Sequence, residues 1–185
     1  WGEYRNIIFP CSDYSFIRRL IKDYYAKEDT EKKKKIRYIN SYNLQKTTHH
    51  CYLLEMIRSR RIIENNFFNI YVCEGTFDTL TVRVALKNQC LAFSSGGATS
   101  TQDLIANRIK EVAEEVFTKT NKKLNIILLY DNDEIGEKGQ EKLYNLLKNC
   151  EYINIYKNFV PLLLKEHKDI NEAFTKDRET FITNL

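Results

Sequence analysis

From Phe67 onward, short apolar runs alternate with segments of helical period. The runs "FNIYVC", "QCLAFS", "LNIILLY" and "YINIYK" are nearly continuous in apolar or β-branched residues, as strands buried on both faces are. Between them, residues 102–117 and 137–148 each place their apolar side chains on one stripe of a helix. This order predicts an α/β fold, in which a parallel sheet has helices on both faces.

The N-terminal part of the chain is less regular. "NIIFP" predicts a strand, "SFIRRLIKDYY" suits either a helix or an extended segment, and charged and polar linkers follow. We therefore expect two parts. Residues 1–66 would form a small mixed α+β basic subdomain, and residues 67–185 would form the α/β domain.

Composition favours a cytoplasmic protein. With 185 residues, 43% of them hydrophobic, the chain is long enough to bury a substantial core. No apolar run reaches the ~18 residues of a membrane-spanning helix, and the N-terminus lacks the pattern of a signal peptide. The five cysteines are scattered without a C-x-x-C pair, which indicates reduced core residues rather than a zinc site. Because the chain starts with Trp rather than Met, we expect a processed or excised fragment.

Basic residues concentrate in the first third of the chain, although the net charge is only +4. They form the clusters "FIRRLIK", "EKKKKIRY" and "MIRSRR", interleaved with tyrosines. A single charge run usually marks a solvated face, but three clusters in one segment favour a surface that meets nucleic-acid phosphates. From charge alone, we expect Arg58, Arg60 and Arg61 to contact the backbone of a template strand.

Carboxylates follow two of the apolar runs directly. Glu74 and Gly75 come after the first run, and Asp78 falls in the first turn of the next helix. Asp131 and Asp133 follow "LNIILLY". Functional groups of parallel sheets gather beyond the carboxyl ends of the strands. If these two strands are neighbours, four carboxylates converge on one rim.

Such a rim favours a divalent cation. Unpaired carboxylates in proximity repel one another and raise one another's pKa values, and a cation removes that cost. Oxygen ligands select Mg²⁺ or Mn²⁺ over zinc. Alternatively, Glu74 and Asp78 stabilise a helix N-terminus and "DND" is a polar turn. The occurrence of both motifs at matching strand ends favours the metal.

Both acidic motifs resemble those of a known family. "CEGTFD" and, further along, "LLYDNDEIG" are similar to the two signature motifs of the Toprim domain of bacterial primases and topoisomerases. The resemblance implies that Glu74, Asp131 and Asp133 are catalytic and hold the metal, with Asp78 as a further metal contact. It also implies that the glycines after each motif, Gly75 and Gly136, permit close turns.

Two further segments resemble DnaG-type and Twinkle-like primases. "EHKDINEAF" is similar to their KDxN/DE element, which implies that Lys168 contacts nucleotide phosphate and that Asp169 contacts metal. Asn171 stands where the DnaG pattern has a second aspartate. "NIIFP…FIRRL…IRYINS" resembles the subdomain that precedes Toprim in these enzymes. That match implies nucleotide or phosphate contacts for Arg19, Arg37, Tyr38 and Asn40.

The resemblance implies the RNA polymerase core of a phage or mobile-element primase. Such a nucleotidyltransferase uses Mg²⁺ or Mn²⁺ and nucleoside triphosphates to make short RNA primers on single-stranded DNA during DNA replication, and a replicative helicase is a candidate partner. One alternative is a Toprim nuclease of the OLD type, which the primase-like N-terminal and "KDINE" segments disfavour. Another is a non-catalytic nucleic-acid-binding module of a larger replication protein. The intact acidic set disfavours that module, whereas the absence of the usual lysine-glycine pair, where "TTHHCY" stands, favours it.

Overall fold

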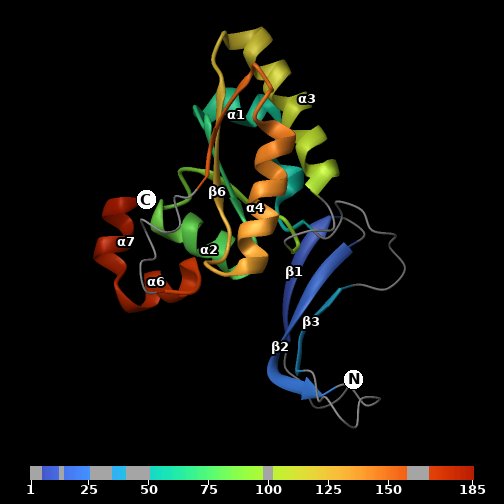
Figure 1. Ribbon diagram of the computed structural model, residues 1–185, viewed down its shortest axis with the longest axis vertical. Coiled ribbons are helices and arrows are strands. Elements are labelled where there is room, and N and C mark those ends of the chain that lie inside the picture. The colour runs from blue at the N-terminus through green and yellow to red at the C-terminus, as the bar shows by residue number, and fades with distance from the viewer. Residues whose placement is uncertain (1–5, 13–14, 26–34, 41–50, 98–101, 158–166) are drawn as a thin grey trace.

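A computed structural model describes residues 6–12, 15–25, 35–40, 51–97, 102–157 and 167–185. They contain two sheets, one antiparallel with the order β1-β2-β3 and one parallel with the order β5-β4-β6-β7 (Figure 1). The antiparallel strands are β1 (Asn6–Ser12), β2 (Ser15–Tyr25) and β3 (Lys35–Asn40). The parallel strands are β4 (Asn69–Cys73), β5 (Leu91–Ser94), β6 (Leu124–Leu129) and β7 (Ile153–Tyr156).

Helices cover both faces of the parallel sheet. They are α1 (Ser59–Asn65), α2 (Thr76–Ala85), α3 (Gln102–Thr120), α4 (Glu134–Leu147), α6 (Ile170–Lys176) and α7 (Arg178–Asn184). Ile70 and Val72 of β4 belong to the core that contains α1, α3 and α4 residues. Tyr71 and Cys73 belong to the second core, with α2, α6 and α7 residues. The residues of β4 divide between the two cores because successive side chains of a strand point to opposite faces. A parallel sheet with helices on both faces confirms the predicted α/β fold.

The segment before β4 also contributes to the main core. Leu54, Ile57 and Ile62 are buried in the same cluster as β4 and α3. Helix α1 ends at Asn66, which adopts the left-handed conformation (φ 57°) that commonly terminates helices. The boundary that we predict between residues 66 and 67 stays a prediction. Within the described residues, no helix is long and apolar enough to cross a membrane.

The N-terminal sheet packs against α2. The ambiguous segment "SFIRRLIKDYY" is strand β2, paired with β1 on one side and β3 on the other. Phe9 of β1 makes edge-to-face ring contacts with Tyr52 and Phe77, at centroid distances of 5.4 and 5.3 Å. Since Phe77 lies beside Asp78 on α2, this contact holds the N-terminal sheet next to the helix that carries part of the acidic motif.

Candidate active site at the carboxyl ends of β4 and β6

The two acidic motifs lie side by side. Strands β4 and β6 are hydrogen-bonded neighbours, and Cys73 pairs with Leu129 at their carboxyl ends. Glu74 and Asp131 therefore emerge at the same edge of the sheet, and each is close enough to perturb the pKa of the other residues of the motif. The two strands are thus neighbours, as the predicted convergence of the carboxylates requires. We call the five carboxylates there the acidic rim: Glu74, Asp78, Asp131, Asp133 and Asp169.

The glycine of each motif lies where the chain packs closely. A Cβ atom on Gly136 would lie 2.2 Å from the backbone oxygen of Asp131. A Cβ atom on Gly75 would lie 2.6 Å from Oδ2 of Asp78. Gly75 has an ordinary extended backbone, with φ −105°, and the atom it approaches belongs to a side chain, so the requirement for glycine is stricter at Gly136, where the close atoms are backbone. Both glycines bring carboxylate-bearing residues close to the ends of the strands.

Three members of the rim, which we call the inner carboxylates, are at least half-buried: Glu74, Asp78 and Asp131. Burial, helped by the charge of Glu74, raises the pKa of Asp131 to about 7. Burial, together with Asp169, raises the pKa of Asp78 to about 6, and Asp78 is only 9% exposed. Burial and Asp133 also raise the pKa of Glu74, and its buried Oε2 has no hydrogen-bond partner among the described residues. For the inner carboxylates, burial therefore outweighs the compensation that nearby donors and charges supply.

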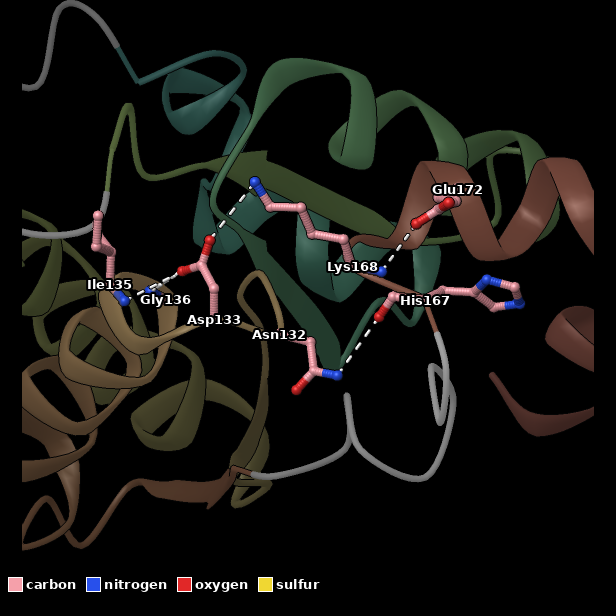
Figure 2. A network of polar contacts seen from close by, with 7 residues as sticks. All are labelled: Asn132, Asp133, Ile135, Gly136, His167, Lys168 and Glu172. Atoms are coloured by element: carbon pink, nitrogen blue, oxygen red, sulfur yellow. Dashed lines mark hydrogen bonds and ion pairs between the residues drawn. The ribbon is translucent and has the colours of Figure 1, made fainter.

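The other two members, the outer carboxylates Asp133 and Asp169, each accept backbone hydrogen bonds at the start of a helix. Oδ1 of Asp133 accepts from the N–H groups of Ile135 (3.1 Å) and Gly136 (2.9 Å) at the start of α4 (Figure 2). These amides, led by that of Gly136, and nearby Lys168 hold the pKa of Asp133 below its usual value. Oδ1 of Asp169 accepts from the N–H of Glu172 (2.7 Å) at the start of α6. Both act as N-caps.

The segment that carries Lys168 is hydrogen-bonded to the "DND" loop. The backbone N–H of Asn132 donates to the carbonyl oxygen of Lys168 (2.8 Å), and Nδ2 of Asn132 donates to the carbonyl oxygen of His167 (3.4 Å; Figure 2). Nζ of Lys168 lies 3.6 Å from Oδ2 of Asp133. The structure thus places Lys168 and Asp169, which the resemblance to the KDxN/DE element singled out, beside the acidic motifs.

Asn171 links α6 to α2. Its backbone N–H donates to Oδ1 of Asp78 (3.2 Å), and its side-chain Oδ1 accepts from the hydroxyl of Thr81 (3.2 Å). Asn171, which stands where the DnaG pattern has a second aspartate, therefore connects two helices. Its distance of ninety residues from Thr81 along the chain explains why local sequence patterns carry no sign of this contact.

Behind the rim lies a buried polar pair that sequence reasoning missed. Gln102, the first residue of α3, and Tyr130, directly after β6, exchange hydrogen bonds of 2.8 and 3.1 Å through the Tyr130 hydroxyl. Burial raises the pKa of Tyr130 to about 12, so the hydroxyl stays protonated. The contact fixes the start of the "DND" loop to α3. A polar residue at the end of an apolar run is the only local signal of it.

Apart from Lys168, the residues predicted to meet phosphates fall in two places. Arg58, Arg60 and Arg61 line one hollow of about 460 Å³, together with Glu55 and Glu64. Arg60 pairs with Glu64 at 2.7 Å, while the buried Nε of Arg61 has no hydrogen-bond partner among the described residues. Arg19 lies on β2, and its backbone pairs with Tyr38 of β3. The side chains of three further predicted contacts lie outside the described residues: Arg37, Tyr38 and Asn40.

Comparison with known proteins identifies the family. A family model described as Toprim-like matches residues 71–174, which is more than half of the chain and includes every carboxylate of the acidic rim. The chain belongs to the Toprim-like family. A search of curated protein sequences finds no significant match.

This Toprim-like chain shares its fold with solved primase structures. The primase fragment of the bacteriophage T7 primase-helicase protein superposes with a TM-score of 0.52 and 18% identity over 97% of the chain. The RNA polymerase domain of Mycobacterium tuberculosis primase DnaG superposes with a TM-score of 0.60 and 14% identity over 98% of the chain. The chain spans 62% of the first structure and 54% of the second. The predicted resemblance to a primase Toprim domain is thus confirmed for family and fold.

The Toprim-like rim has the donors that a hard divalent cation needs. In the arrangement described, no three His, Cys, Asp or Glu side chains within the described ranges already form a metal-binding group. The buried and unpartnered Oε2 of Glu74 and the raised pKa of Asp131 nevertheless fit a cation, because both are unfavourable until positive charge arrives. Oxygen-only donors suit Mg²⁺ or Mn²⁺. Glu74 and Asp131 fit such an ion, and Asp133 lies close enough to Glu74 to be a third candidate donor.

Proposed function

We propose that this chain is the RNA polymerase core of a DNA primase, a nucleotidyltransferase that makes short RNA primers on single-stranded DNA. The observation that carries the proposal is the pair Glu74 and Asp131. They stand on adjoining strand ends, both have raised pKa values, and one buried oxygen of Glu74 has no hydrogen-bond partner. A fold shared with two primase structures supports the same assignment.

In the proposed reaction, a 3′-hydroxyl attacks the α-phosphorus of an incoming nucleoside triphosphate and pyrophosphate leaves. A bound Mg²⁺ or Mn²⁺ would orient the triphosphate and neutralise charge on the leaving group. Glu74 takes the hydroxyl proton, because its raised pKa brings it closer to the pH at which a general base works best. Asp133 stays ionised through the amides of α4, and Asp169 and Asp78 add negative charge at the edge of the same site.

Basic residues would bind the substrates. Lys168 meets the triphosphate from the edge of the acidic rim, where its ammonium group already lies near Asp133. Arg19 and three residues of β3 meet nucleotide phosphates from the subdomain that packs on α2: Arg37, Tyr38 and Asn40. The hollow lined by Arg58, Arg60 and Arg61 binds the phosphate backbone of the template.

Two further features complete the proposal. The T7 structure comes from a primase-helicase protein, and we propose a replicative helicase as a partner of this chain too. We also propose that the chain works in the cytoplasm during DNA replication.

A primer-synthesis assay tests the proposal. The chain is incubated with single-stranded DNA, labelled nucleoside triphosphates and Mg²⁺ or Mn²⁺, and products are resolved by length. New labelled RNA that depends on both template and metal is the expected result. Shortened DNA would instead support an OLD-type nuclease. DNA binding with neither product would support a non-catalytic module.

A salt series tests the template hollow separately. Each phosphate neutralised on a single strand contributes a slope of about −0.7 to log affinity against log salt. Replacing Arg58, Arg60 and Arg61 by Ala should flatten the slope, as measured by fluorescence anisotropy. An unchanged slope would place the template track elsewhere.

A further inference from the structure

Lys168 brings a positive charge to the acidic rim. Its Nζ lies 3.6 Å from Oδ2 of Asp133 (Figure 2). Its influence extends beyond that pair, because it also lies near enough to Glu74 and Asp131 to favour their ionised forms. A single ammonium group therefore partly offsets the repulsion among the carboxylates that would bind a divalent cation.

The backbone of Lys168 is anchored, whereas its side chain is held weakly. Its carbonyl oxygen accepts from the N–H of Asn132 (2.8 Å), and its own N–H donates to Oε2 of Glu172 (2.9 Å). The side chain is 62% exposed, and ion pairs at such exposure contribute little to stability because water screens them. The backbone hydrogen bonds thus keep the ammonium group beside the rim, but its ion pair with Asp133 is easily replaced by an ion pair with another anion.

We propose that Lys168 is a tethered counter-ion of the acidic rim. It neutralises the rim while no divalent cation is bound, and it transfers from Asp133 to the triphosphate when the cation binds with the nucleotide. This inference rests on the proposed function, because it assumes that the rim takes a divalent cation and a triphosphate. It assigns to Lys168 control over how tightly each of them binds.

The inference predicts effects of opposite sign. Without the ammonium group the rim is more negative, so Mn²⁺ alone should bind more tightly. The triphosphate loses a cationic contact, so ATP in the presence of saturating Mn²⁺ should bind less tightly. A residue that merely supports the fold would weaken both, because a distorted rim binds neither ligand well.

Calorimetric titration of the full chain tests the first effect. Lys168→Gln should bind Mn²⁺ about threefold or more tightly than the parent, as expected for loss of a like charge at a partly solvated edge. Lys168→Arg, which keeps the charge, should restore the parental affinity. The matched control is Lys138→Gln. Lys138 is similarly exposed, at 68%, but pairs with Glu134 outside the rim, so its replacement should leave Mn²⁺ affinity unchanged.

Titration with ATP at saturating Mn²⁺ tests the second effect, where Lys168→Gln should bind about threefold or more weakly. Equal or weaker Mn²⁺ binding by Lys168→Gln, relative to Lys138→Gln, would overturn the inference. So would unchanged ATP affinity. The variant Asp131→Asn/Asp133→Asn separates this failure from that of the proposed site. If it binds Mn²⁺ as the parent does, or if the parent binds none, the metal site is wrong and the inference fails with it.

Discussion

The inner and outer carboxylates of the acidic rim respond in opposite ways to their surroundings. Asp131 and Asp133 are two residues apart on one loop, yet the pKa of Asp131 is raised to about 7 and that of Asp133 is lowered. Asp131 is half-buried beside Glu74. Asp133 accepts hydrogen bonds from two backbone N–H groups and lies near Lys168. Burial without donors favours the neutral acid, whereas donors favour the ion.

This difference indicates separate roles for the inner and the outer carboxylates. The outer carboxylates serve the fold as helix caps, and the pKa of Asp133 is held below its usual value. The inner carboxylates have raised pKa values and gain most from a cation. Changes to inner and outer residues should therefore have distinct, and in one case opposite, consequences.

The largest effect is expected at Glu74. Glu74→Gln keeps the size of the side chain but removes its charge and basicity, so nucleotide incorporation should fall by more than about a hundredfold. Binding of single-stranded DNA should persist, because the basic residues are untouched. Primer synthesis and fluorescence anisotropy measure the two properties. Glu137→Gln, in the first turn of α4 and outside the rim, is the control, and near-equal incorporation by Glu74→Gln and parent would refute the assigned role.

A large loss of stability is expected at Gly136. In Gly136→Ala the added Cβ would meet the backbone oxygen of Asp131 at 2.2 Å, which forces the two sides of the "DND" loop apart. Alanine is the better helix former by about 1 kcal/mol, so a net loss of more than about 2 kcal/mol in urea unfolding would show that the overlap dominates. Lys138→Ala, on an exposed face of the same helix, should change stability by less than about 0.5 kcal/mol. A parental midpoint for Gly136→Ala would contradict the close packing.

A gain of stability is expected at the inner residue Asp131. In metal-free buffer at pH 8, Asp131→Asn should unfold at a higher urea concentration than the parent. Its free energy of unfolding should be larger by about 1–2 kcal/mol, after allowance for solvent screening. The folded pKa of Asp131 is about 7 and the unfolded value is about 4, so ionisation destabilises the fold as pH rises between them. The gain should therefore vanish below about pH 4, grow up to about pH 7 and then stay constant. A gain independent of pH would exclude this origin.

A smaller loss is expected at the outer residue Asp133. Asp133→Ala removes the cap of α4 and should cost about 1 kcal/mol, measured by the same urea titrations. Asp133→Asn should be close to the parent, since asparagine caps helices about as well as aspartate. If Asp133→Ala were as stabilising as Asp131→Asn, the distinction between inner and outer carboxylates would be lost.

Long amphipathic helices and apolar strands were predictable from the sequence, and short helices were not. Periodicity predicted α3 and α4 and the apolar runs predicted β4 to β7, within a few residues of their bounds. Helices α1, α6 and α7, each of seven residues, are too short for periodicity to identify. The segment of β2 suits a helix as well as a strand, and only pairing with β1 and β3 decides the outcome.

The sequence by itself determined which residues end the strands. Apolar runs followed by Glu74 and by Asp131 require the carboxylates to stand where the strands end, and neighbouring glycines mark the close approach. These are local properties of the chain. That β4 lies beside β6, that Asn171 braces α2, and that Lys168 reaches Asp133 were decided only by the tertiary structure. The physical reason is that burial and charge pairing depend on groups distant along the chain, so two aspartates two positions apart have pKa values shifted in opposite directions.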